Sequence, residues 1–126
     1  MKILLSYISV LTALAVLDSV WFRVVAKSFY GKEIGHLMRA EPVWLAIIIF
    51  YLLYAGAVVF FVVMPAGGSW TKALLLGALL GFTVYMTYEL VNYAILKDWA
   101  FSVVIPDILW GMFMTASAAL AGFFVL

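Results

Sequence analysis

The chain contains four apolar stretches that are each long enough to cross a lipid bilayer, at about residues 3–25, 43–64, 73–96 and 101–126. An α-helix rises 1.5 Å per residue, so roughly 20 residues cross a hydrocarbon core of about 30 Å. Because 69% of the residues are hydrophobic and only 10% are charged, a water-soluble domain is excluded. The linkers are short, so the sequence predicts an all-α membrane protein whose residues 1–126 form a single transmembrane domain, an antiparallel bundle of four transmembrane helices.

The composition also excludes several kinds of site. Cysteine is absent, which rules out disulfides and thiolate metal ligands, and the lone histidine, His36, cannot form a histidine-rich metal centre within one chain. No metal site and no cofactor are therefore predicted. The net charge of +1 gives no reason to expect a nucleic-acid partner. The lipid bilayer is the partner that the sequence requires.

Lysine and arginine are distributed unequally between the two sides of the predicted bundle. One side has only Lys2 and Lys72. The other side, formed by the first and third linkers and the end of the first span, has Arg23, Lys27, Lys32, Arg39 and Lys97. Basic residues favour the cytoplasmic side of a membrane. The distribution predicts a multi-pass protein of the bacterial cytoplasmic (inner) membrane with both termini outside the cytoplasm.

Three carboxylates, Asp18, Glu89 and Asp107, lie inside the first, third and fourth apolar stretches. An ionisable group in hydrocarbon is costly, and it is interpreted as functional by default. Each acid is eight or nine residues from a charged residue at the cytoplasmic end of its span; these markers are Lys27, Lys97 and Asp98. At 1.5 Å per residue, all three acids are expected roughly 12 to 14 Å below that end, in one layer. They are the candidate catalytic or ion-binding residues.

The acid layer has more than one interpretation. Like charges at that spacing cannot all stay ionised in a low dielectric, so at least one acid is expected to be protonated or to share a cation. Alternatively, buried acids act as structural hydrogen-bond partners between helices. Pro106 also favours a helix that begins there, in which Asp107 would be a first-turn residue at the surface.

Aromatic and amide side chains at helical spacing from the acids can donate hydrogen bonds to them. These candidates for substrate binding are Trp21, Tyr85, Tyr88, Asn92 and Trp110. The first linker, residues 26–42, is either a solvated connection or an interfacial lid over the acids. Candidates for gating or interfacial roles are His36, Arg39, Asp98 and Trp99.

Other features of the spans have structural interpretations. Gly77 and Gly81 form a small-xxx-small pair, which predicts close helix packing or, as the sharper alternative, a homodimer through that face. The second span has no charge, only Tyr51 and Tyr54 among apolar residues, and is expected to be a wall of the bundle. Trp44, Trp70 and Trp99 lie at span ends, where tryptophan is typical of the membrane interface.

Three strings carry a resemblance to a known family: LDSVWF at residues 17–22, YMTYELVNYAILKDW at 85–99 and PDILWG at 106–111. The chain resembles, over nearly its whole length, small bacterial four-span integral membrane proteins catalogued as a domain of unknown function. The resemblance points to Asp18, Trp21, Tyr88, Glu89, Asn92, Asp98, Trp99, Asp107 and Trp110. The chain departs from that pattern at Glu89, where aspartate is expected, and at Ala100, where proline is common. The resemblance implies the architecture and no activity.

Three functions remain open at this point. The acid layer could bind or transport a small amphiphilic or cationic solute, coupled to a proton or a cation. It could instead serve an acid/base enzyme, an isomerase or cyclase acting on a lipid or isoprenoid substrate, in which a neutral carboxylic acid donates a proton. The third alternative is a small accessory subunit of a larger membrane complex.

Overall fold

The computed structural model describes all 126 residues and contains only helices, turns and short connections. Its α-helices are α1 (Lys2–Trp21), α2 (Lys27–Ile34), α3 (Trp44–Val58), α4 (Trp70–Ile95) and α5 (Val104–Val125). Two π-helical segments, η1 (Phe22–Ala26) and η3 (Val59–Val63), extend α1 and α3, and two short 3-10 turns are η2 (Gly35–Leu37) and η4 (Phe101–Val103). Four helical segments are long and apolar enough to cross a membrane: Lys2–Leu37, Trp44–Val63, Trp70–Ile95 and Phe101–Val125. The predicted all-α membrane fold is confirmed.

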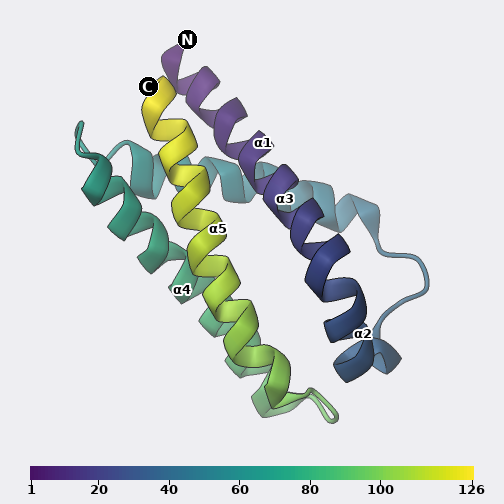
Figure 1. Ribbon diagram of the computed structural model, residues 1–126. Coiled ribbons are helices and arrows are strands. Elements are labelled where there is room, and N and C mark those ends of the chain that lie inside the picture. Colours follow the sequence, from purple (N-terminus) through teal and green to yellow (C-terminus); the bar gives the residue numbers. More distant parts are fainter.

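Helix α5 is the centre of the bundle. It lies between α1 and α4, and it returns toward the end of the molecule where both termini are found (Figure 1). Small residues dominate its buried surface, including Gly111, Ala118, Ala119 and Gly122. Because small side chains let neighbouring backbones approach closely, α5 can contact a helix on each side.

Gly77 and Gly81 are buried at the contact between α4 and α5. A Cβ atom on Gly77 would lie 2.8 Å from the Cα of Ala116, and one on Gly81 would lie 2.3 Å from the backbone oxygen of Gly111. The predicted close helix packing is confirmed. The face expected for a homodimer is therefore covered by α5 of the same chain, and that part of the prediction is corrected.

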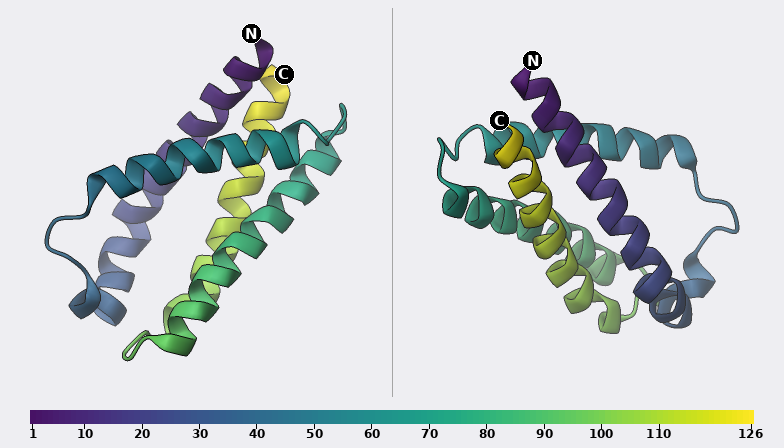
Figure 2. Two further views of the ribbon diagram at one scale, coloured as in Figure 1. Left: turned by 180° about the vertical axis from the view of Figure 1, so that it is seen from behind. Right: turned by 45° about the horizontal axis from the view of Figure 1, so that its top comes forward.

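Helix α3 crosses the other three spans at a steep angle instead of lying alongside them (Figure 2). Its second half is anchored by buried Tyr54, Ala55 and Val58, whereas side chains in its first half, such as Leu45 and Ile48, are exposed. These exposed apolar side chains are suited to contact with lipid. Helix α3 thus belongs to the bundle mainly through its C-terminal half.

The first linker is mostly helical. The helix begun at Lys2 continues without interruption through η1 and α2 to Ile34. A π-helical segment widens the helix and commonly bends it, and here the chain turns at the lower end of α1, to one side of the α4–α5 hairpin (Figure 1). The linker is helical as far as Leu37 and mostly exposed, so the solvated connection and the interfacial lid both stay predictions. Helix α2 and the α4–α5 hairpin lie at the end of the bundle opposite to the termini.

Candidate functional site

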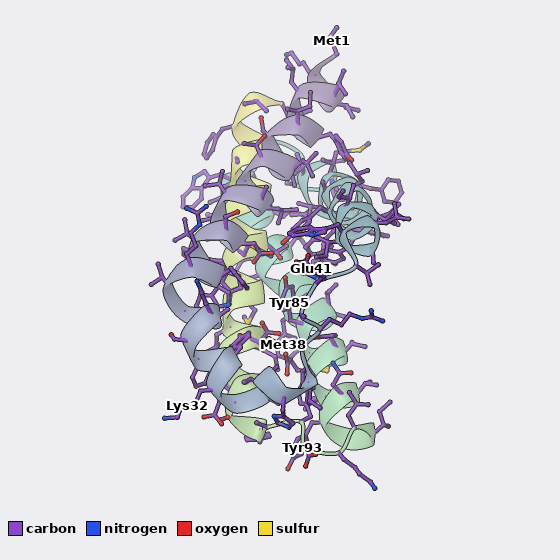
Figure 3. The ribbon with its side chains drawn as sticks, turned by 90° about the vertical axis from the view of Figure 1, so that its right-hand side faces the viewer. Met1, Lys32, Met38, Glu41, Tyr85 and Tyr93 are labelled. Atoms are coloured by element: carbon purple, nitrogen blue, oxygen red, sulfur yellow. The ribbon has the colours of Figure 1, made fainter.

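The three acids lie in the half of the bundle near α2 and the α4–α5 hairpin. Glu89 on α4 is 2% exposed and Asp107 on α5 is 7% exposed, while Asp18 on α1 is partly buried. Figure 3 shows Lys32 directed outward from the bundle and Tyr85 near mid-height of the molecule. The acids face the interior and not the lipid, as the sequence predicts.

Asp18 is held by two other spans. The Trp110 indole on α5 donates to its Oδ1 at 2.9 Å, and the Tyr51 hydroxyl on α3 donates to its Oδ2. Both oxygens therefore accept a hydrogen bond from a residue within a transmembrane helix. Asp18 joins α1, α3 and α5 in the way that polar residues fasten helices within a membrane.

Glu89 and Asp107 form a pair of neighbouring carboxyl groups. The Trp99 indole donates to Glu89 Oε1 at 3.0 Å, and the Tyr30 hydroxyl donates to Asp107 Oδ1 at 3.0 Å. Trp99 is in the α4–α5 hairpin and Tyr30 is on α2, so both donors come from segments that connect the long helices. The pair is thus covered by short peripheral segments, whereas Asp18 is fixed by the spans themselves.

No basic side chain hydrogen-bonds to these acids; the donors are tyrosine and tryptophan only. Two buried carboxylates in contact, without a neutralising cation, would repel each other strongly in poorly hydrated surroundings. A shared proton removes that repulsion. The Glu89–Asp107 pair is therefore suited to exchange a proton for another monovalent cation.

An aromatic bridge connects Asp18 with the acid pair. The rings of Trp21 and Trp110 are stacked, with centroids 4.5 Å apart and an angle of 8° between planes, and Trp21 meets Tyr30 edge-on at 6.2 Å. Trp110 donates to Asp18 and Tyr30 donates to Asp107, so the bridge ends on an acid at each side. Such ring faces can stabilise a bound cation.

Tyr85 lies close to the same region. Its ring packs directly on Gly111, where a Cβ atom would come within 2.2 Å of the ring. Gly111 is therefore the residue that gives this ring space beside α5. The predicted placement of Tyr85 near the acids holds, while its role in binding stays a prediction.

Several expectations for individual residues need correction. Asp107 is in the first turn of α5, but that helix begins at Val104 and the side chain is buried, so a surface position for Asp107 is wrong. Trp110 bonds to Asp18 on another helix and not to Asp107, its neighbour along α5. The three acids, expected in one layer, consist of a neighbouring pair, Glu89 and Asp107, and of Asp18, which is held by Tyr51 and Trp110.

The remaining candidates lie at the edge of this region or outside it. Tyr88 is about half exposed and meets Trp99 edge-on, and Asn92 is half-buried. His36, Arg39 and Asp98 are exposed. Asp98 has a φ of 65°, a left-handed conformation that aspartate tolerates in a tight turn, which gives it a structural reason to be in the hairpin.

Two donors to the acids were missed by the sequence interpretation, Tyr30 and Tyr51. Tyr51 gives α3 a part in the site and not only in enclosing the bundle, because its hydroxyl donates a hydrogen bond to Asp18. A phenol inside an otherwise apolar span needs a hydrogen-bond partner, and that requirement was the available signal. For Tyr30 the signal was weaker, since nothing in the sequence shows that α2 folds back beneath the bundle.

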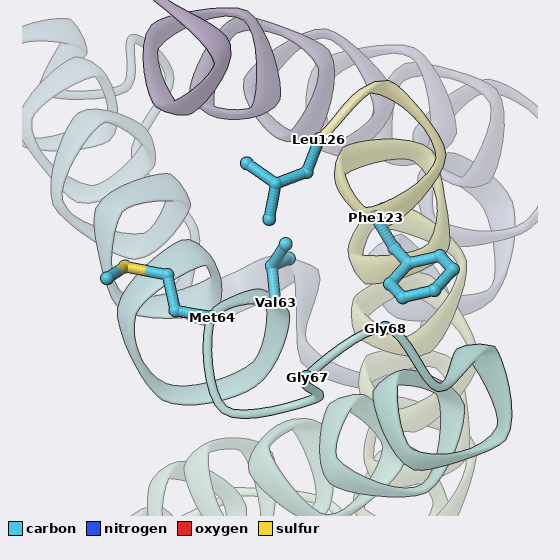
Figure 4. A pocket seen from close by; sticks show the side chains of 6 residues that line it. All are labelled: Val63, Met64, Gly67, Gly68, Phe123 and Leu126. Atoms are coloured by element: carbon cyan, nitrogen blue, oxygen red, sulfur yellow. The ribbon is translucent and has the colours of Figure 1, made fainter.

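Two surface hollows lie away from the acids. One, of about 230 Å³, is at the end of the bundle near the C-terminus, lined by Val63, Met64, Gly67, Gly68, Phe123 and Leu126 (Figure 4). The other is a shallow hollow of about 300 Å³ on the surface of α1, beside Arg23. Neither includes Asp18, Glu89 or Asp107.

Comparison with known families accounts for nearly the whole chain. Residues 3–124 match the family described as predicted membrane protein, DUF2177. The chain belongs to this family. This match confirms the resemblance seen in the sequence. The family is uncharacterised and described as a membrane protein, and this chain has four candidate spans. No curated protein and no solved structure matches the chain.

Proposed function

We propose that this DUF2177 protein binds a small amphiphilic monovalent cation at Glu89 and Asp107, in exchange for a proton that the pair shares, as the binding step of proton-coupled transport. One observation carries the proposal: a buried pair of adjacent acids has no basic partner, and its hydrogen-bond donors, Tyr30 and Trp99, both come from connecting segments. The carboxyl pair supplies the charge that attracts a cation. The surrounding rings supply apolar and cation–π contacts.

The different anchoring of the acids gives the proposal its mechanism. Trp99 and Tyr30 can withdraw from Glu89 and Asp107 by movement of the hairpin and α2, without unpacking α5 from its neighbours. Asp18 is bonded by Tyr51 and Trp110 within the spans, so it holds the frame while the pair exchanges its ion. Opening of short peripheral segments over a rigid frame is a common way to admit a ligand.

Cation binding can be tested with tetraphenylphosphonium and the purified full-length protein in detergent. Glu89→Gln or Asp107→Asn should weaken binding roughly 30-fold or more, because each removes a buried charge from the attracting pair. Equilibrium dialysis measures the affinity. Glu41→Gln is the matched control, since Glu41 is exposed in the α2–α3 connection, and it should leave the affinity unchanged. Unchanged affinity in both acid variants, or no binding by the unsubstituted protein, contradicts the proposal.

We also propose the orientation in the membrane. Helix α2 and the α4–α5 hairpin, with Lys27, Lys32 and Lys97, would face the cytoplasm, and both termini would lie outside it. The acid pair would then open toward the cytoplasm. Fusions of a periplasm-active and a cytoplasm-active reporter to the C-terminus test this orientation. Activity of the cytoplasmic reporter alone would reverse it.

A further inference from the structure

The Trp21 indole N–H is buried and has no hydrogen-bond partner. The Tyr30 hydroxyl is the polar group near it and interacts with the N–H, but without the geometry of a full hydrogen bond. A buried donor without a partner is rare in native proteins and carries the full penalty of desolvation. The position of this donor therefore needs an explanation.

Packing alone does not explain it. Trp21 stacks on Trp110 and meets Tyr30 edge-on through its ring faces and edges, and these contacts need an aromatic ring without a polar group. A phenylalanine would supply a ring without the unsatisfied donor. The N–H is thus a polar group that the closed structure does not use.

The donor lies next to the proposed cation site. Tyr30 touches Trp21 with its ring and bonds to Asp107 with its hydroxyl at 3.0 Å, so one side chain separates the free N–H from the acid pair. When Tyr30 withdraws to admit a ligand, the Trp21 N–H becomes available to it. A ligand atom that accepts this hydrogen bond would be only a few bonds from the positive charge.

We propose that Trp21 is a specificity-determining residue whose indole N–H donates to an acceptor oxygen on the ligand. The ligand class is then narrowed to amphiphilic cations with a hydroxyl, ether or carbonyl oxygen close to the charged nitrogen. This inference rests on the proposed function and deepens it. A site built to hydrogen-bond a ligand group discriminates against the analogue that lacks it, because its donor is left unpaired.

Two probes of nearly equal size test the inference in the full-length protein: benzyldimethyl(2-hydroxyethyl)ammonium and benzyldimethylpropylammonium, which differ in a hydroxyl and a methyl group. The hydroxyl probe should bind about tenfold more tightly to the unsubstituted protein, from the usual penalty for an unpaired buried donor. Trp21→Phe should abolish this preference. Trp70→Phe, at an exposed tryptophan far along the chain, should retain it.

The outcomes separate this inference from the proposed function. If neither probe binds, the cation site itself is wrong. If both bind with equal affinity to the unsubstituted protein, the cation site stands and the role of Trp21 is overturned. If Trp21→Phe weakens both probes by the same factor and keeps the preference, Trp21 acts only by packing on Tyr30, and the inference is again overturned. Equal affinities in the unsubstituted protein overturn the role of Trp21 even if the variant fails to fold.

Discussion

Lowering the pH is expected to weaken cation binding by up to tenfold per pH unit for each proton that the acid pair releases. A proton and the cation compete for Glu89 and Asp107, which are buried, adjacent and free of basic partners. Acidification favours the protonated pair, so the sign of the effect is loss of affinity as pH falls. At a pH low enough for each acid to carry its own proton, both protons leave when a cation binds, and the slope of log affinity against pH doubles. This is the largest functional effect that the site predicts.

The proton count can be measured directly. Titration calorimetry of the tetraphenylphosphonium complex in two buffers with different ionisation enthalpies gives the number of protons released. Asp107→Asn leaves one titrating acid. A slope of two in the plot of log affinity against pH should therefore fall to one or less in this variant. Glu41→Gln should leave the slope unchanged, since it removes an exposed carboxylate outside the site. Affinity that does not change with pH would rule out proton exchange even if the cation binds.

The sequence contains most of the information that defines the fold. Long apolar runs predict the spans, and the acids at similar depth predict that Asp18, Glu89 and Asp107 share one half of the bundle. Spacing along a helix identifies neighbours on that helix only. It could not show that Trp110 bonds to Asp18 on α1, or that Tyr30 returns to Asp107, because these contacts depend on how separate helices are placed.

The path of α3 was the least predictable part of the fold. Its span is apolar on nearly every side, so no polar face indicates which surface turns inward or how the helix is inclined. The anchors that orient it are few: Tyr51 to Asp18, and Tyr54 to Thr115 at 2.6 Å. Each joins residues far apart in the sequence, and a single sequence does not reveal such pairs.

Gly81→Ala is expected to lower the free energy of unfolding by about 3 kcal/mol or more, at the upper end for overpacked cores. A methyl group at Gly81 would meet the Gly111 oxygen at 2.3 Å and the Met112 Cα at 2.9 Å, which are backbone atoms of α5 that no rotamer change can move. Helices α4 and α5 would have to separate. The contact between Glu89 and Asp107 depends on that same packing, so cation affinity should fall with stability.

Chemical denaturation followed by circular dichroism, in the same detergent for each variant, measures this loss. Gly31→Ala is the matched control, because a methyl group there meets nothing within 4 Å and α2 is helical at that position. Alanine is the better helix former, so this control should be neutral or slightly stabilising. Gly111→Ala is less informative, since its methyl group would strike the Tyr85 ring and disturb the site directly. Equal stability of the Gly81 and Gly31 variants would mean that α4 and α5 are farther apart than the structure has them, and the acid pair could not then form as described.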